Sequence, residues 1–106
     1  MEYEITPREL KQRLERKEEI LIVDVREPWE RQTASITPSQ HLPMADVPSR
    51  FQELDPDQHI VVYCHHGVRS LSVTDWLRKQ GYEKAQSMSG GIDQWSLDID
   101  PKVSRY

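Results

Sequence analysis

Two short runs of apolar residues constrain the fold of this chain more than any other feature. They are Ile20–Val23 and Ile60–Tyr63, and neither contains a charged residue. A strand with one face in water alternates apolar and polar residues, so these continuous runs predict strands that are covered on both faces. Such strands are typical of a parallel sheet packed between two layers of helices.

The rest of the chain predicts short helices that alternate with strands. Thr6 can cap a helix, because Pro7 suits the first helical position and Glu9 completes a capping box. The expected strands are Tyr3–Ile5, Ile20–Val23, His41–Met44, Ile60–Tyr63 and Ala85–Met88, and the expected helices or helical turns are 6–16, Pro28–Arg31, Ser49–Leu54, Arg69–Gln80 and Ile92–Trp95, followed by a tail at Leu97–Tyr106. This order predicts right-handed βαβ units and a mostly parallel sheet, with ligands bound beyond the carboxyl ends of the strands.

Length and composition exclude several classes of protein. We expect one domain over residues 1–106, because 106 residues can bury a single core. The net charge of −4, without a basic cluster, argues against nucleic acid and anionic membranes as partners. There is no apolar stretch of membrane-spanning length and no visible signal peptide. The single cysteine excludes an internal disulfide, and we expect a cytoplasmic monomer.

That cysteine, Cys64, directly follows the apolar run Ile60–Tyr63 and precedes a predicted helix. Unpaired backbone N–H groups and the positive end of a helix dipole meet at such a position, and both stabilise a negatively charged sulfur. Asp24 follows the other apolar run, so it should lie at the same edge of the sheet. Cys64 is therefore the best candidate for a nucleophile, although a free cysteine can also be a small buried apolar residue.

The residues from Cys64 to Ser70 read Cys-x-x-Gly-x-Arg-Ser, and this motif resembles the active-site loop of rhodanese-type sulfurtransferases. Three further segments are similar to signatures of that family: Leu21–Glu27 (LIVDVRE), Ser89–Trp95 (SGGIDQW) and the tail with Asp100-Pro101 and Arg105-Tyr106. The similarity covers essentially the whole chain. It departs at Ala34-Ser35 and Pro38-Ser39, where the family usually has glycines and a histidine.

The resemblance implies a fold and a function. The fold would be a three-layer αβα domain of the rhodanese-like type, with a central, mostly parallel, five-stranded sheet. Cys64 would take a sulfane sulfur from a thiosulfate-like anion or a protein persulfide and pass it to a thiophilic acceptor. The loop residues His65, His66, Gly67, Val68, Arg69 and Ser70 would surround the persulfide, with Asp24 and Arg26 as supporting residues. No cofactor is implied.

Several alternatives remain open at the level of sequence. The chain could be a protein-interaction or sulfur-relay module, or more remotely a phosphatase or arsenate reductase. The related phosphatases have seven residues from cysteine to arginine, whereas the sulfurtransferase loop has six, as from Cys64 to Arg69. Arg69 could bind the donor or pair with a carboxylate such as Asp24 or Glu27. His65 could face the mouth of the loop or solvent.

No metal site is expected from the sequence. The residues Cys64, His65 and His66 are consecutive, and adjacent side chains rarely converge on one ion.

Overall fold

The computed structural model describes residues 1–106 and contains one sheet of five strands. The strands are β1 (Glu4–Ile5), β2 (Ile20–Asp24), β3 (Gln40–His41), β4 (His59–Tyr63) and β5 (Ala85–Met88), in the spatial order β1-β5-β4-β2-β3. Every pairing between neighbouring strands is parallel. The predicted central parallel sheet is therefore confirmed.

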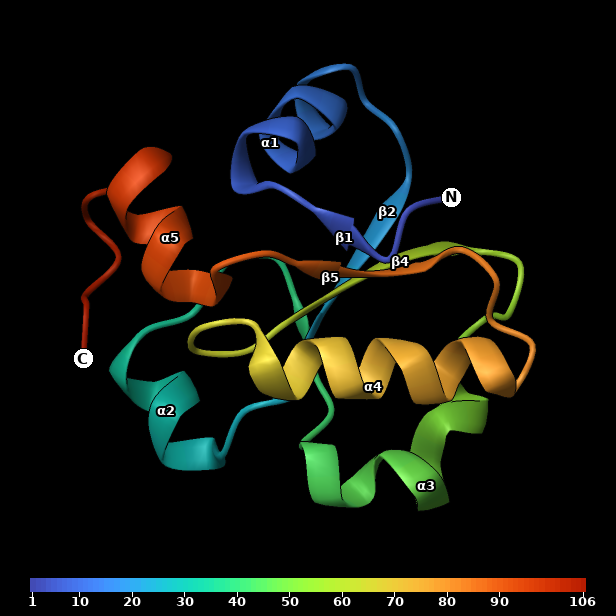
Figure 1. Ribbon diagram of the computed structural model, residues 1–106. Helices are drawn as coiled ribbons and strands as arrows, with labels where there is room; N and C mark the ends of the chain where they lie inside the picture. The colour runs from blue at the N-terminus through green and yellow to red at the C-terminus, as the bar shows by residue number, and fades with distance from the viewer.

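Helices cover both faces of the sheet (Figure 1). They are α1 (Pro7–Glu15), α2 (Pro28–Thr33), α3 (Val47–Arg50), α4 (Val68–Lys79) and α5 (Gly91–Asp98). In the view of Figure 1, α1 and α5 lie above the sheet and α3 and α4 below it, which gives the predicted three layers. None of these helices has the length and apolar character that a bilayer crossing requires.

The side chains of β4 divide between two hydrophobic cores. Val61 and Tyr63 pack with residues of α1 and α5, whereas Ile60, Val62 and the next residue after the strand, Cys64, pack with residues of α3 and α4. The side chains alternate in this way because successive residues of a strand point to opposite faces. Ile60 to Tyr63 have no accessible surface, so the continuous apolar run correctly predicted a strand covered on both sides.

Three predicted boundaries were wrong. Strand β3 ends at His41 and not at Met44, because Pro43 has no N–H to donate and a 3₁₀ turn begins at Met44. Helix α3 begins at Val47, followed by Pro48, and a 3₁₀ turn continues it over Phe51–Glu53. The last helix extends over Gly91–Asp98, past the single turn expected at Ile92–Trp95, and Ser96 is also buried.

A cluster of charged and polar side chains fixes the carboxyl end of β2. Asp24 and Arg26 have no accessible surface, and their side chains form two hydrogen bonds of 2.9 Å. Arg31 and the Tyr63 hydroxyl each donate to the same carboxylate at 3.1 Å. Burial opposes ionisation of Asp24, but the hydrogen bonds and charge of Arg26 outweigh it and hold its pKa below the usual range. The cluster therefore contains a buried, fully paired carboxylate.

We expect Asp24→Asn to destabilise the fold by about 3–5 kcal/mol, because it leaves the Arg26 guanidinium buried without a counter-charge. The free energy of unfolding in urea measures this loss. Asp98→Asn is the matched control, because Asp98 lies 4.0 Å from the well-exposed Arg8 and its loss should cost less than about 1 kcal/mol. Equal effects of the two substitutions would contradict the structural importance of the buried cluster.

Candidate active site

Cys64 directly follows strand β4, and three groups of the following loop reach its sulfur. The backbone N–H groups of Gly67 and Ser70 donate to Sγ at 3.1 Å and 3.3 Å, and the thiol in turn donates to Ser70 Oγ at 3.4 Å. Only 1% of Cys64 is exposed. The loop thus curls around one sulfur atom, as the sequence predicted, with donors that suit a negative charge.

The hydroxyl of Ser70 belongs to a short buried chain of polar atoms. It donates to the Gly67 carbonyl at 3.2 Å and lies 2.7 Å from the hydroxyl of Ser87 on β5. No motif in the sequence pointed to Ser87. A signal was available, because a serine inside a buried strand requires a hydrogen-bond partner.

Helix α5 holds the first part of the loop from the other side. The N–H of Ile92 donates to the Cys64 carbonyl at 2.9 Å, and the N–H of Asp93 donates to the His65 carbonyl at 3.1 Å. This approach is possible because Gly91 has no side chain: a Cβ there would collide with the His65 carbonyl and lie 2.6 Å from the Cys64 carbonyl. The Gly-Gly-Ile-x-x-Trp segment therefore forms part of the wall of the site.

Arg69 pairs with a carboxylate, so its guanidinium is not free to bind an anionic sulfur donor. Its guanidinium forms two hydrogen bonds with Glu30 of α2, at 2.7 Å and 2.9 Å. The prediction of Asp24 or Glu27 as the partner of Arg69 was therefore wrong. Asp24 is occupied by Arg26 and Arg31, and the Glu27 side chain accepts from the backbone at the start of α2. The hydrogen bonds from Arg69 chiefly lower the pKa of Glu30, to about 2.

Tyr106 connects this ion pair to the buried cluster under β2. Its hydroxyl donates to Glu30 Oε2 at 2.6 Å and accepts from Arg26 Nη1 at 2.8 Å. Burial and the neighbouring Glu30 raise the pKa of Tyr106 to about 12. Asp24 and Arg26 thus connect to the loop through Tyr106, Glu30 and Arg69. No periodicity or spacing in the tail identified Tyr106 as part of the site.

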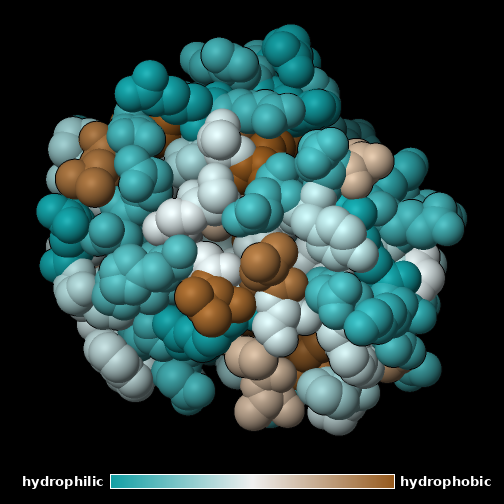
Figure 2. Space-filling model, viewed as in Figure 1, coloured by the Kyte–Doolittle hydropathy of each residue, from teal (hydrophilic) through white to brown (hydrophobic).

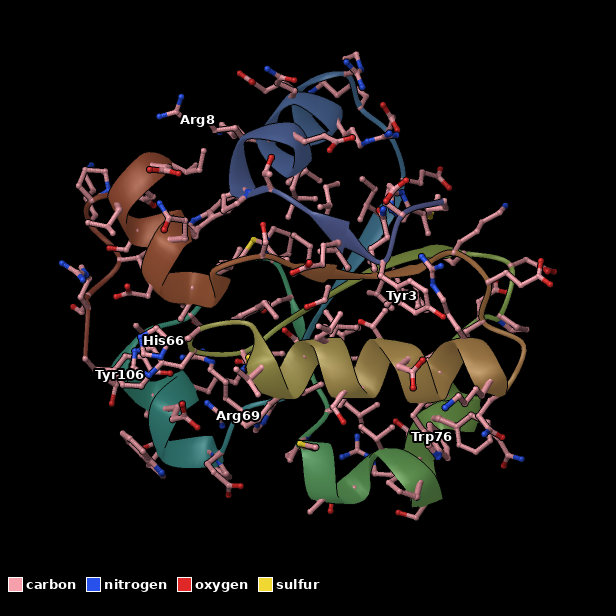
Figure 3. The ribbon with its side chains drawn as sticks, viewed as in Figure 1. Tyr3, Arg8, His66, Arg69, Trp76 and Tyr106 are labelled. Atoms are coloured by element: carbon pink, nitrogen blue, oxygen red, sulfur yellow. The ribbon has the colours of Figure 1, made fainter.

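The two histidines of the loop do not behave alike. The ring of His65 is stacked between the rings of His66 and Tyr106, with 3.9 Å between the centroids in each pair. Figure 3 shows His66 and Tyr106 near the end of the loop. Burial first, and then the nearby His66, lower the pKa of His65, so it is neutral at pH 7. His66 is exposed. His65 therefore does not simply face solvent, and its place at the mouth of the loop stays a prediction.

Val68 is the most exposed apolar residue of the loop, with 80% of its surface accessible. Leu71, one turn further along α4, and Met44 at the end of the facing loop are also exposed. Figure 2 shows apolar side chains gathered near the centre of this face, over the first turns of α4, in a surface that is otherwise mostly hydrophilic. The surface beside the cysteine loop therefore includes a group of exposed apolar side chains.

The comparison with known protein families agrees with this geometry. The family model of the rhodanese-like domain matches residues 6–98. The chain belongs to the rhodanese-like domain family. A sulfurtransferase of Allochromatium vinosum is 38% identical over 101 residues, which are 95% of this chain and 94% of the relative. The thiosulfate sulfurtransferase GlpE of Pseudoalteromonas translucida is 35% identical over 84% of this chain and 85% of its own length.

A solved structure shares the fold as well. The rhodanese-related protein of Thermoplasma volcanium superposes with a TM-score of 0.86 at 27% identity, over 99% of this chain and all of the other. The three-layer rhodanese-like fold that the sequence implied is thus confirmed. Relatives named as sulfurtransferases support sulfur transfer as the activity of the family.

Gly91→Ala should displace the cysteine loop, because the new methyl group would overlap the carbonyls of Cys64 and His65. Gly81→Ala is the matched control, since Gly81 also has a positive φ (+99°) but no atom lies within 4 Å of a Cβ built there. We expect Gly81→Ala to cost about 1–2 kcal/mol through backbone strain alone, and Gly91→Ala to cost more. Urea unfolding gives the stabilities, and the alkylation rate of Cys64 reports the loop. If both variants keep the wild-type rate, α5 does not set the loop geometry.

Glu30→Gln should make stability less dependent on pH in the acid range. The pKa of Glu30 lies below its ordinary value of 4.5 in the folded protein, so its stabilisation is present above about pH 4.5 and is lost as pH falls toward about 2. We expect a loss of roughly 2 kcal/mol at neutral pH and little further loss in acid. The urea concentrations at the unfolding midpoints of the wild type and of Glu30→Gln, compared at pH values between these two and at neutral pH, measure this difference in stability.

Glu53→Gln is the control for this experiment, because Glu53 forms the same two-fold pair with Arg50 on an exposed surface. It should change the stability by less than about 1 kcal/mol at any pH. An acid profile of Glu30→Gln that parallels the wild type would contradict the assigned ion pair.

Proposed function

We propose that this chain is a sulfurtransferase that carries a sulfane sulfur as a persulfide on Cys64. The observation that carries the proposal is the convergence of the Gly67 and Ser70 N–H groups on Sγ, with the Ser70 hydroxyl beside them. These donors can stabilise a thiolate before the reaction and a negatively charged persulfide after it. Family membership and relatives named as sulfurtransferases support the same activity.

In the first step, the Cys64 thiolate attacks the sulfane sulfur of the donor. With thiosulfate, a new S–S bond forms to Cys64, the bond between the two sulfurs of thiosulfate breaks, and sulfite leaves with the electron pair. The negative charge then resides on the terminal sulfur of the persulfide. The loop needs no other side chain as a nucleophile, in agreement with the single cysteine.

In the second step, the nucleophile of a thiophilic acceptor, such as cyanide or a thiolate, attacks that terminal sulfur. The bond from the terminal sulfur to Cys64 breaks, and Cys64 leaves as the thiolate that the Gly67 and Ser70 N–H groups stabilise. No net oxidation or reduction occurs, and no cofactor is required. The same two N–H groups thus stabilise the Cys64 thiolate as the nucleophile of the first step and as the leaving group of the second.

The size of the loop argues against phosphoryl transfer. In the loop from Cys64 to Ser70, two N–H groups already lie within 3.3 Å of Sγ, so the loop closes tightly around the sulfur. In addition, both arms of Arg69 are bound to Glu30. A phosphatase or arsenate reductase would use such an arginine to bind oxyanion oxygens.

A second candidate function is a sulfur relay, in which the donor is a persulfide on another protein. Two observations favour it over free thiosulfate. Arg69 is bound to Glu30 and His65 is neutral, so neither side chain offers a free positive charge to an anionic donor. In addition, the exposed Val68, Leu71 and Met44 offer an apolar surface near the loop for a partner protein. The chemistry at Cys64 is the same in both cases.

Incubation with thiosulfate should add the mass of one sulfur atom to the intact protein, and a thiol reductant should remove it. Cys64→Ser should gain no mass and should lose thiosulfate:cyanide turnover, because a hydroxyl cannot form a persulfide. Sulfate is the control reagent, since it has no sulfane sulfur. Circular dichroism should show that Cys64→Ser keeps the fold.

The outcomes of this experiment separate the candidate functions. Loading by thiosulfate supports the small-molecule donor, whereas loading by a persulfide-bearing protein but not by thiosulfate supports the relay. Wild-type turnover in Cys64→Ser would exclude Cys64 as the nucleophile. Hydrolysis of aryl phosphates that exceeds sulfur transfer would favour the phosphatase alternative.

A further inference from the structure

Three side chains with metal-binding atoms meet at the rim of the loop, outside the group of donors around Cys64. Ring nitrogens of His65 and His66 and a carboxylate oxygen of Asp93 all lie within 4.8 Å of one another. His65 and His66 are adjacent in the sequence, and Asp93 comes from the first turn of α5. The fold therefore supplies the third group that the sequence alone did not show.

The positions of His65 and Asp93 are fixed by contacts independent of any ion. The N–H of Asp93 donates to the His65 carbonyl at 3.1 Å, which ties their backbones together. The His65 ring is held against the Tyr106 ring, whose hydroxyl is anchored by Glu30 and Arg26. Because the backbones of two ligands are already held together, less conformational freedom is lost when an ion binds.

One atom of the cluster lacks the partner that its burial requires. His65 Nε2 has essentially no accessible surface and no hydrogen-bond partner. A buried ring nitrogen without a partner costs about 1–3 kcal/mol, and such a group in a folded protein calls for an explanation such as a bound ion. This second observation is independent of the spacing of the three side chains.

We propose that His65, His66 and Asp93 form a binding site for a divalent transition metal of the zinc type. Two imidazoles and one carboxylate are the ligand set of many zinc, cobalt and nickel sites, whereas calcium and magnesium prefer oxygen ligands alone. Three protein ligands leave a fourth position open for water or another ligand.

Binding requires a defined local change. In a tetrahedral zinc site, ligand atoms lie about 3.3 Å apart, so the three ligand atoms, which lie within 4.8 Å of one another, must move closer together by at most about 1.5 Å. The His65 and His66 rings are stacked, with 25° between their planes, and in-plane lone pairs of stacked rings cannot meet at one ion. His66 must therefore turn off the stack, and it is free to do so because it is exposed.

Arg105 competes with the metal for Asp93. Its guanidinium donates to Asp93 at 2.8 Å and 3.4 Å from an exposed position. An ion bound to Asp93 would displace this contact and would be repelled by the arginine. The structure thus makes an unusual prediction, that the loss of a positive charge next to the site strengthens metal binding.

The test measures binding of Co²⁺ and Zn²⁺ to the full chain carrying Cys64→Ser and no histidine tag, by visible absorption of Co²⁺ and by calorimetry. The catalytic thiol is absent, so the result does not depend on the proposed sulfur transfer. We expect one ion per chain. His66→Ala and Asp93→Asn, each in this background, should weaken binding at least about tenfold, and Arg105→Ala should strengthen it.

His59→Ala is the matched control, because His59 lies at the start of β4, bound to Gln86, and should not change the affinity. Absence of saturable binding, or equal affinity in Cys64→Ser with and without His66→Ala, would overturn the proposal. Failure of Asp93→Asn and Arg105→Ala to change the affinity would also overturn it, because Asp93 would then not be a ligand.

Discussion

Two backbone hydrogen bonds between α5 and the cysteine loop are the contact on which the rest of the site depends. They fix the carbonyls of Cys64 and His65 against the first turn of α5, where the peptide N–H groups have no partner within the helix. With its start held in this way, the loop curls back so that later N–H groups reach the sulfur. The contact requires Gly91, because any Cβ would occupy the space of the two carbonyls.

A chain of charged and polar groups surrounds this contact and controls the electrostatics of the loop. It passes from the buried Asp24–Arg26 pair through the Tyr106 hydroxyl to Glu30 and Arg69. Because Glu30 forms hydrogen bonds with both terminal nitrogens of Arg69, it neutralises the positive charge of this loop residue. The proposed stabilisation of a persulfide then comes from the backbone N–H groups of Gly67 and Ser70.

Some members of the site could be predicted from the sequence because their roles are local. Cys64 follows a buried strand and Ser70 lies in the first turn of α4, so both had to be near the same helix end. Glu30 could not be chosen in advance, because Asp24 and Glu27 are carboxylates in the same segment and are equally plausible in charge. Asp24 and Glu27 already form other hydrogen bonds in the folded protein, and α2 places Glu30 where Arg69 can reach it.

The sequence by itself determined the parallel sheet, because two uninterrupted apolar runs can be buried only when helices cover both faces of their strands. It also determined the sulfur-bearing loop, whose glycine, arginine and serine are close to the cysteine along the chain. The tertiary structure alone decided the partners that lie far apart in sequence: Tyr106 on His65 and Glu30, Ser87 on Ser70, and Asp93 beside the two histidines. The physical reason is that local patterns fix which face of an element is buried, whereas the packing of α5 and the tail against the loop fixes which distant side chains meet.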